Sequence, residues 1–283
     1  MRSLQEALKI ITANLGYAEM RHKATQSLYQ GQICEAAKVM ASGVEDADDT
    51  EGIQQAWNEV SKLFTGWEEK AELAVQYYLA LGDKVGLNLI STNQSAPLSI
   101  VYLRNRGSDG AYDHFTRGSD DARAMYVTSH EEALDNCYDE YADACILPYS
   151  DPERGVHMGF RMLISRYGFK INSLVRVENR EGTAMDYVLL RRECDLIDGD
   201  AYLSITLPMS SGLDLSPLLI AAKHCSLNEA SVVRLPDTYA NRESYDLHFY
   251  GSREAIWRYL FYLSLNFPRY ELLGIYRKEK ENI

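Results

Sequence analysis

The stretch over residues 251–276, GSREAIWRYLFYLSLNFPRYELLGIY, decides the fold of the C-terminal part of the chain. Ser252 is a preferred N-cap residue and opens a helix predicted over 253–265. The residues expected to face inward on this helix are Ile256, Leu260 and Leu263. Phe267-Pro268 ends the helix, and the apolar run that follows predicts a final strand over 270–276.

The preceding residues complete a strand-helix-strand-strand-helix-strand order. Strands are predicted over 202–207, 230–235 and 245–250, and a helix is predicted over 216–224 between the first two. A polar hairpin loop over 237–242 joins the second and third strands. This order predicts a ferredoxin-like βαββαβ unit.

Upstream of this unit, strand and helix patterns alternate. The predicted strands are 99–103, 124–127, 142–147, 170–177 and 187–191, and the predicted helices are 129–141 and 155–167. Ser129, with Glu132 three residues later, forms a capping box. We expect Pro148 to stop the third strand and Gly168 to end the second helix. The alternation predicts a mostly parallel sheet with helices packed on it.

The N-terminal residues 1–90 contain no proline and follow helical periodicity. Helices are predicted over 4–15, over 18–41, from Thr50 as a possible N-cap, and over 68–81. This region therefore predicts a helical hairpin or bundle.

Composition narrows the function classes. The 283-residue chain has a formal net charge of −12, which argues against nucleic acid and against anionic membrane surfaces as partners. No run of about 18 apolar residues predicts a membrane span. The five cysteines lack a C-x-x-C pair, as expected of reduced thiols in a cytoplasmic protein. No metal-ligand spacing and no nucleotide fingerprint occur, so we expect neither a metal nor a cofactor.

The loop predicted over 104–110 is a candidate anion site. Gly107-Ser108-Asp109-Gly110 follows a strand and offers backbone N–H groups, and Arg104 and Arg106 add positive charge. His157, near the start of a predicted helix, could contact the same anion. A plain tight loop and a surface histidine are the alternatives.

Several stretches resemble the prephenate dehydratase family. LSITLPMSSGLDLSPLLIAAKHCSLN (203–228), VVRLP (232–236) and the stretch over 251–276 resemble the ACT domain that follows the catalytic part of these enzymes. IVYLRNRGSDG (100–110), YVTSHEEAL (126–134), YADACILPYSDPERG (141–155) and YGFKINSLVRV (167–177) resemble the first lobe of the catalytic domain.

The resemblance implies a multidomain protein of the α+β and α/β classes. It comprises a helical domain over 1–93, a periplasmic-binding-like α/β lobe over 94–196, and a ferredoxin-like ACT domain over 197–283. Many bacterial members place a chorismate mutase domain first, for which only Arg21 and Lys23 are suggestive here.

The resemblance also implies sites and partners. The substrate-like positions are Gly107, Ser108, Ser129, Ser150 and Asp151. The regulatory-ligand positions are Gly212, Leu213, Asp214, Leu215, Val233, Arg234, Leu235 and Pro236. The implied partners are a small-molecule ligand, such as an aromatic amino acid, and a second copy of the chain bound through the ACT unit.

The sequence departs from the family at its catalytic motifs. Arg104 replaces the first glycine of the loop, Ser150-Asp151-Pro152 replaces a Glu-Asn-Ser turn, and Met185-Asp186-Tyr187 replaces Thr-Arg-Phe. Only one lobe of α/β sequence precedes the ACT unit, whereas the enzyme works in a cleft between two lobes.

These departures leave two function classes open. The first is a catalytically degenerate, cytoplasmic dimer that binds an amino acid or another ligand. The second is an active enzyme of aromatic amino acid biosynthesis, either a prephenate dehydratase or a chorismate mutase. A protein-interaction role unrelated to aromatic metabolites is a further alternative.

Overall fold

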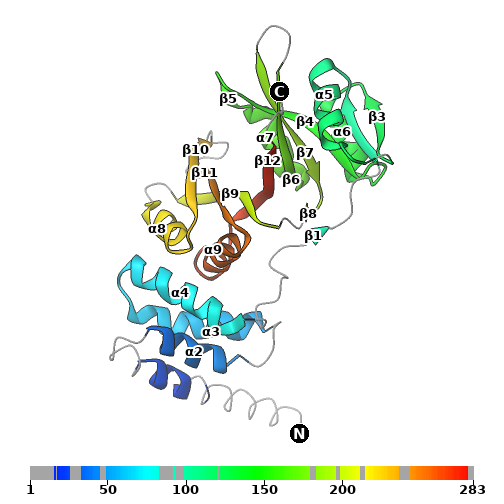
Figure 1. Cartoon of the computed structure of the whole chain (residues 1–283). Coiled ribbons are helices and arrows are strands. Elements are labelled where there is room, and N and C mark those ends of the chain that lie inside the picture. The colour runs from blue at the N-terminus through cyan, green and yellow to red at the C-terminus, as the bar shows by residue number, and fades with distance from the viewer. Residues whose placement is uncertain are drawn as a thin grey trace. The chain divides into compact units, whose positions relative to one another are not determined.

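The structure is a computed structural model (Figure 1). It describes residues 16, 18–25, 33–44, 49–82, 92–93, 99–119, 121–178, 183–195, 198–210, 214–235 and 242–279. The chain divides into two compact units. The helical unit comprises Met1–Leu89, Gly212–Asn228 and Glu254–Pro268, and the sheet unit comprises Ile90–Ser211, Glu229–Arg253 and Arg269–Ile283.

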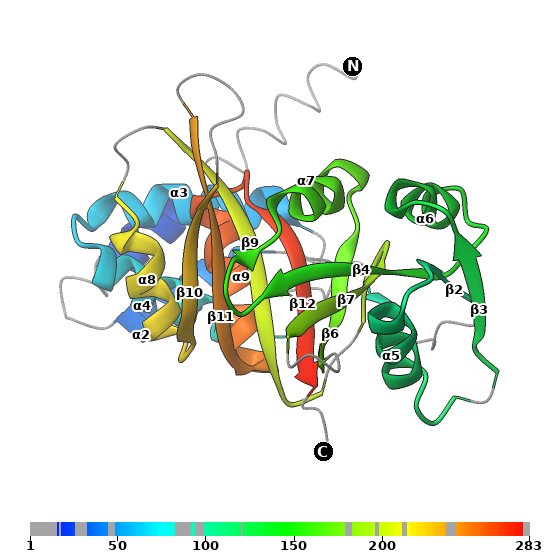
Figure 2. The same ribbon diagram turned by 90° about the horizontal axis from the view of Figure 1, so that it is seen from above.

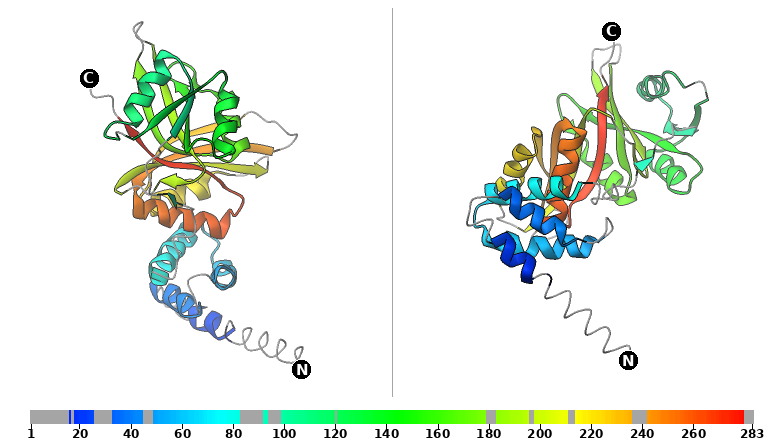
Figure 3. Two further views of the ribbon diagram at one scale, coloured as in Figure 1. Left: turned by 90° about the vertical axis from the view of Figure 1, so that its right-hand side faces the viewer. Right: turned by 60° about the horizontal axis from the view of Figure 1, so that its bottom comes forward.

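The helical unit is built from amphipathic helices. These are α2 (Ile33–Ser42), α3 (Thr50–Val60), the short 3₁₀ helix η1 (Ser61–Leu63), α4 (Trp67–Leu81), α8 (Ser216–His224) and α9 (Arg253–Asn266). Helix α4 packs against α2 and α8, and Figure 3 shows α2 to α4 in blue and cyan. The rings of Tyr77 and Tyr78 lie 5.8 and 5.6 Å from the ring of Phe261, so α9 shares this core.

Most of the helices predicted for this unit are confirmed where the structure describes them. Helix α4 matches the prediction over 68–81, and α3 begins at Thr50, although its N-cap is Asp49, whose Oδ1 accepts the Gly52 N–H at 2.7 Å. Within the helix predicted over 18–41, residues 18–25 are helical and α2 begins at Ile33. Residues 26–32 and the helix predicted over 4–15 lie outside the described residues.

One large sheet organises the other unit. Its strands are β2 (Ser99–Leu103), β3 (Arg123–Val127), β4 (Ala144–Asp151), β5 (Gly155–Val156), β6 (Lys170–Glu178), β7 (Ala184–Arg191), β9 (Asp200–Ser210), β10 (Asn228–Leu235), β11 (Arg242–Ser252) and β12 (Glu271–Glu279). Among the described residues their order is β10-β11-β9-β12-β6-β7-β4-β2-β3, and β5 pairs with β4. Two short strands, β1 (Thr92–Asn93) and β8 (Cys194–Asp195), pair separately.

The expectation of a mostly parallel sheet is wrong. The pairs β2–β3, β2–β4 and β6–β12 are parallel, whereas β4–β7, β6–β7, β9–β12 and β9–β11 are antiparallel. Strands β6 and β7 follow each other across a short connection, and strands joined in that way pair antiparallel. The sheet is therefore mixed.

The C-terminal strands join the rest of the sheet through β12. The order β10-β11-β9-β12 agrees with the predicted strand-helix-strand-strand-helix-strand connectivity. Strand β12 also pairs with β6, and Gly274 lies at this junction. A Cβ atom at Gly274 would lie 2.8 Å from the backbone nitrogen of Ile171, so the close approach requires glycine.

Helices cover both faces of the sheet around β2 and β4 (Figure 2). Helix α5 (Arg106–Phe115) packs on one face, where Ala111 contacts the cluster of Ile100 and Ile146. Helices α6 (His130–Tyr138) and α7 (Met158–Tyr167) pack on the other face over a second apolar cluster. None of the described helices is long and apolar enough to cross a membrane.

Three local predictions are corrected. The loop predicted over 104–110 is mostly the first turn of α5, because Asn105 caps a helix there. Strand β4 continues through Pro148 to Asp151, with a register irregularity beside the proline that a bulge tolerates. Helix α7 begins at Met158 rather than at 155, because Gly155 and Val156 form β5 against β4.

Candidate functional site

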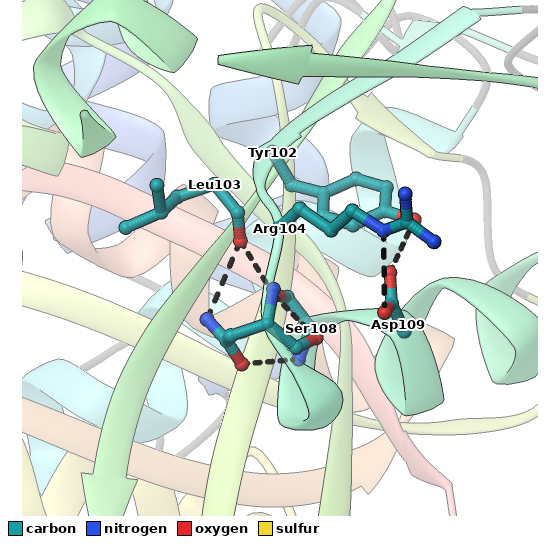
Figure 4. Close-up of polar contacts among 6 residues, drawn as sticks. Tyr102, Leu103, Arg104, Ser108 and Asp109 are labelled. Atoms are coloured by element: carbon teal, nitrogen blue, oxygen red, sulfur yellow. Dashed lines mark hydrogen bonds and ion pairs between the residues drawn. The ribbon is translucent and has the colours of Figure 1, made fainter. Parts of the chain in front are cut away.

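The N-terminus of α5 is held by a reciprocal capping box. Asn105 Oδ1 accepts the Ser108 N–H at 3.0 Å, and Ser108 Oγ accepts the Asn105 N–H at 3.1 Å. Ser108 Oγ also donates to the Leu103 carbonyl at 2.6 Å, and the close-up in Figure 4 shows this turn. Because Ser108 is 2% exposed, its hydroxyl stabilises the turn and is not presented to a ligand.

Gly107 lies directly against Tyr187 of β7. A Cβ atom at Gly107 would lie 2.8 Å from Tyr187 Cζ and still closer to the phenolic oxygen. Only glycine therefore lets the ring reach the start of α5. Tyr187 is 7% exposed, and burial raises the pKa of its hydroxyl.

Ser150 and Asp186 bind each other at the ends of β4 and β7. Ser150 Oγ donates to Asp186 Oδ2 at 2.7 Å, and Arg176 of β6 donates to both carboxylate oxygens at 2.8 and 3.1 Å. Asp186 is 4% exposed. Its carboxylate thus connects three neighbouring strands and is neutralised by the Arg176 guanidinium.

Asp151 shapes the turn after β4. Its Oδ1 accepts the N–H groups of Arg154 and Glu153 at 2.6 and 2.9 Å, and its Oδ2 lies 3.2 Å from His157 Nε2. The Arg154 N–H is the main cause that holds the pKa of Asp151 below its usual value, with further help from Glu153 and His157. The Asp151 carboxylate is therefore ionised at neutral pH.

These elements line an open pocket of about 890 Å³, which we name the α5 pocket. Its lining includes Gly107 and Asp151 from the predicted substrate-like positions, but not Ser108, Ser129 or Ser150. Ser129 caps α6 instead, where its Oγ accepts the Glu132 N–H at 3.1 Å. The structure thus brings two of the five predicted residues to one cavity, and their roles stay predictions.

The lining also includes Arg106 and His157, which the sequence suggests as contacts of an anion. The sequence did not indicate a site role for other lining residues, among them Arg154, Glu178, Met185 and Tyr187. Met185 and Tyr187 flank Asp186 in the segment that departs from the family motif. The departure from the family motif was the only feature of the sequence that drew attention to this segment. Side chains alternate along a strand, so Met185 and Tyr187 lie on the opposite face of β7 from Asp186.

The predicted regulatory positions are described only in part. Asp214 Oδ1 accepts from the Ser216 N–H and hydroxyl at 2.9 and 2.7 Å, and Leu215 precedes α8. Val233, Arg234 and Leu235 lie on β10, with Arg234 exposed and Leu235 buried. Gly212, Leu213 and Pro236 lie outside the described residues.

The two residues suggestive of a mutase site are in ion pairs. Arg21 Nη1 lies 3.1 Å from Glu59, and Lys23 Nζ lies 2.7 Å from Glu19. In the described part of the chain no group of three or more His, Cys, Asp or Glu side chains is placed to hold a metal ion. Cys34, Cys137, Cys145, Cys194 and Cys225 are all free thiols.

These features define a mixed α/β protein with the fold of the prephenate dehydratases. An X-ray structure of prephenate dehydratase from Streptococcus mutans is similar over 64% of this chain and 98% of that chain, with a TM-score of 0.52 and 16% identity. This similarity confirms at the level of the fold the resemblance inferred from the sequence.

Two further prephenate dehydratase structures are similar to the chain. The enzymes are from Arthrobacter aurescens, in complex with L-Phe, and from Staphylococcus aureus, and they are 13% and 8% identical. Each covers 63% of this chain, and the chain covers 89% and 100% of them, with TM-scores of 0.47 and 0.48. The sequence matches no family model and no curated protein.

Proposed function

We propose that this prephenate-dehydratase-like protein has no dehydratase activity and is a dimer that binds a regulatory amino acid through a C-terminal ACT domain. The main observation in support of the proposal is that Ser150 and Arg176 both donate hydrogen bonds to the carboxylate of Asp186. By resemblance, Asp186 stands at the arginine of the family's Thr-Arg-Phe motif. Ser150 stands at the glutamate of its Glu-Asn-Ser turn.

The charge at this position is the reverse of what the family reaction needs. An arginine there would bind a substrate carboxylate through two parallel hydrogen bonds. Asp186 repels a carboxylate, and both of its oxygens already accept hydrogen bonds from Arg176. A doubly negative substrate such as prephenate therefore meets a carboxylate at position 186, where the family holds an arginine, and the neighbouring Arg176 guanidinium is already paired with that carboxylate.

The strand order supports the ACT part of the proposal. Strands β9 to β12 follow the order β10-β11-β9-β12, and β10 is an end strand among the residues that the structure describes. An end strand has backbone groups that can pair with a second copy. Arg234 is exposed on β10, and Asp214 orders the turn before α8. Together with the sequence resemblance, these observations favour a dimer with ligand positions in these segments.

An active enzyme is the alternative. One observation favours a mutase: the helical unit contains a cavity of about 580 Å³ lined in part by Arg21, His22 and Glu59. Against it, the Arg21 guanidinium is 3.1 Å from Glu59, which competes with an anionic substrate.

The purified full chain tests the proposal. We expect no loss of prephenate or chorismate, a rise in Tm with phenylalanine, tyrosine or tryptophan, and the mass of a dimer by light scattering. A ligand that binds only the native state raises its stability, so Tm reports binding directly. Prephenate turnover would overturn the proposal, and chorismate turnover would favour the mutase alternative. Absence of both turnover and a Tm shift would favour a protein-interaction role.

A further inference from the structure

We propose that an amino acid bound at the turn before α8 is sensed by the N-terminal helices α3 and α4, which open and close as one unit with α8 and α9. This inference rests on the proposed function, because it concerns the response to the regulatory amino acid bound there. It makes the helical unit, rather than the dehydratase-like sheet unit, the part of the protein that responds to the ligand.

The turn before α8 is connected to α9 by a buried hydrogen bond. Asp214 Oδ1 accepts hydrogen bonds from the N–H and the hydroxyl of Ser216, the first residue of α8, at 2.9 and 2.7 Å. The carbonyl of Pro217, the second residue of α8, accepts the hydroxyl of the buried Tyr262 at 3.3 Å. A ligand that orders this turn therefore also holds in place the acceptor of a buried α9 side chain.

Helix α9 is in turn held by the N-terminal helices at two places. In its middle, the ring of Phe261 lies 5.8 and 5.6 Å from the rings of Tyr77 and Tyr78 of α4. At its C-terminal end, Gln54 Nε2 of α3 donates to the Leu265 carbonyl at 3.1 Å. The last carbonyl groups of a helix have no partner inside it, so α3 satisfies one of them from outside.

Helix α8 is joined to α4 directly. The two helices pack against each other, and at the C-terminal end of α8 His224 Nδ1 lies 3.5 Å from Glu72 Oε2. Gln76 Nε2 donates to Glu72 Oε1 at 3.0 Å, which orients the carboxylate toward α8. The N-terminal helices thus contact both α8 and α9, and a movement of either one disturbs these contacts.

These four helices belong to one compact unit, which groups Met1–Leu89 with Gly212–Asn228 and Glu254–Pro268. Segments that share a core open and close together as a cooperative unit. An amino acid that binds only the closed form of the turn lowers the population of the open form. It therefore protects α3 and α4, although neither helix contributes a predicted ligand position.

Hydrogen exchange of the full chain, measured by mass spectrometry, tests the inference. The probes are L-phenylalanine, L-tyrosine and L-tryptophan at saturating concentration, and a rise in Tm reports which of them binds. We expect the bound amino acid to slow amide exchange in peptides from α3 and α4 at least about fivefold. Peptides from α6, in the sheet unit, are expected to exchange as they do without the ligand.

Two variants interrupt the connection outside the ligand turn. Tyr262→Phe removes the hydroxyl that binds the start of α8, and Glu72→Gln removes the carboxylate beside its end. Each is expected to lose the ligand-induced slowing in α4. The matched controls are Tyr259→Phe, also buried in α9, and Glu68→Gln, exposed in the first turn of α4. Both controls are expected to keep it.

The outcomes separate this inference from the proposed function. A rise in Tm without slower exchange in α3 and α4, or with equal slowing in α6, overturns the inference and leaves amino-acid binding intact. Slowing in α4 that survives both Tyr262→Phe and Glu72→Gln also overturns it. No rise in Tm with any of the three amino acids overturns the proposed function, and this inference with it. Loss of the slowing in the two variants, with both controls unchanged, supports the inference.

Discussion

Arg161 of α7 donates to both carboxylate oxygens of Asp246 of β11, from Nε at 2.7 Å and from Nη2 at 2.9 Å. Their side chains are 1% and 2% exposed. Thr206 Oγ1 also donates to Asp246 at 2.5 Å, and Arg161 Nη1 donates to Ser165 Oγ at 2.6 Å. Burial alone would lower the pKa of Arg161, but the hydrogen bond to Asp246 raises it above its ordinary value, so the pair is ionised.

Asp246→Ala is expected to destabilise the protein by about 3–5 kcal/mol, because it leaves the Arg161 charge buried without a partner. The double variant Arg161→Met with Asp246→Leu is expected to cost much less, since it removes both charges and keeps apolar volume. Urea unfolding midpoints measure the difference.

A surface pair provides the comparison for this prediction. Lys38 lies 2.6 Å from Glu35 on α2, and both side chains are more than half exposed. Glu35→Gln should change the free energy of unfolding by less than about 1 kcal/mol. If Asp246→Ala cost no more than Glu35→Gln, the buried pair would not hold α7 on the sheet.

Gly107→Ala is expected to destabilise by about 1–3 kcal/mol, because the added methyl group overlaps the Tyr187 ring. Gly159→Ala is the matched control in α7, where a Cβ atom meets nothing within 4 Å. The control should be neutral or stabilising by up to about 1 kcal/mol. In a Tyr187→Leu background the cost of Gly107→Ala should shrink. An unchanged cost there would rule out the ring as its cause.

Elements with a strong local pattern could be predicted from the sequence. Helix α8 matches its predicted bounds, and α9 differs from its prediction by one residue, because each combines apolar periodicity with a Pro or Ser at its start. The strands predicted over 170–177 and 187–191 correspond to β6 and β7. For these elements the pattern of neighbouring residues is sufficient to predict the structure.

Features set by distant contacts could not be predicted. Helix α5 was missed because Gly107 and Gly110 read as loop residues. In the structure, Gly107 is in α5, and its lack of a side chain leaves room for the ring of Tyr187, which is 80 residues later in the sequence. The joining of β12 to β6 likewise depends on Gly274 meeting Ile171. A close contact between segments that are far apart in the sequence produces no periodic pattern of residues from which it could be predicted.

The residues of the candidate site could likewise be predicted only in part. Gly107 and Asp151 could be selected as polar or flexible residues at strand ends, and they do line one cavity. Ser108, Ser129 and Ser150 have the same local appearance, but their hydroxyls bind the backbone or Asp186. Residue type alone cannot distinguish a hydroxyl offered to a ligand from one that caps a helix.

Ser108→Ala is expected to cost about 1–3 kcal/mol, because the Leu103 carbonyl and the Asn105 N–H both lose a buried partner. Ser129→Ala provides the exposed comparison, since it loses one cap hydrogen bond to the Glu132 N–H. That loss should cost about 1 kcal/mol. Thermal unfolding of both variants measures the difference, and a larger loss in Ser129→Ala would contradict the role given to Ser108.

His248 of β11 should make stability depend on pH. The side chain is 7% exposed, and burial is the main cause that lowers its pKa, with Asp246 opposing and Arg161 adding to the effect. The folded protein therefore favours the neutral imidazole, and the unfolded chain binds the proton more readily. Stability from this residue is fully present above the unfolded pKa of about 6.5 and is lost as pH falls from there through the folded pKa.

His248→Gln is accordingly expected to flatten the decline of unfolding free energy between about pH 7 and pH 5. Half-buried His130, whose pKa is also lowered by burial, contributes with the same sign, so part of the decline should persist in the variant. The matched control is His22→Gln, which replaces an exposed histidine of the helical unit. Urea unfolding at a series of pH values measures these slopes. A slope unchanged by His248→Gln would mean that the folded protein accommodates the imidazolium as well as the unfolded chain does.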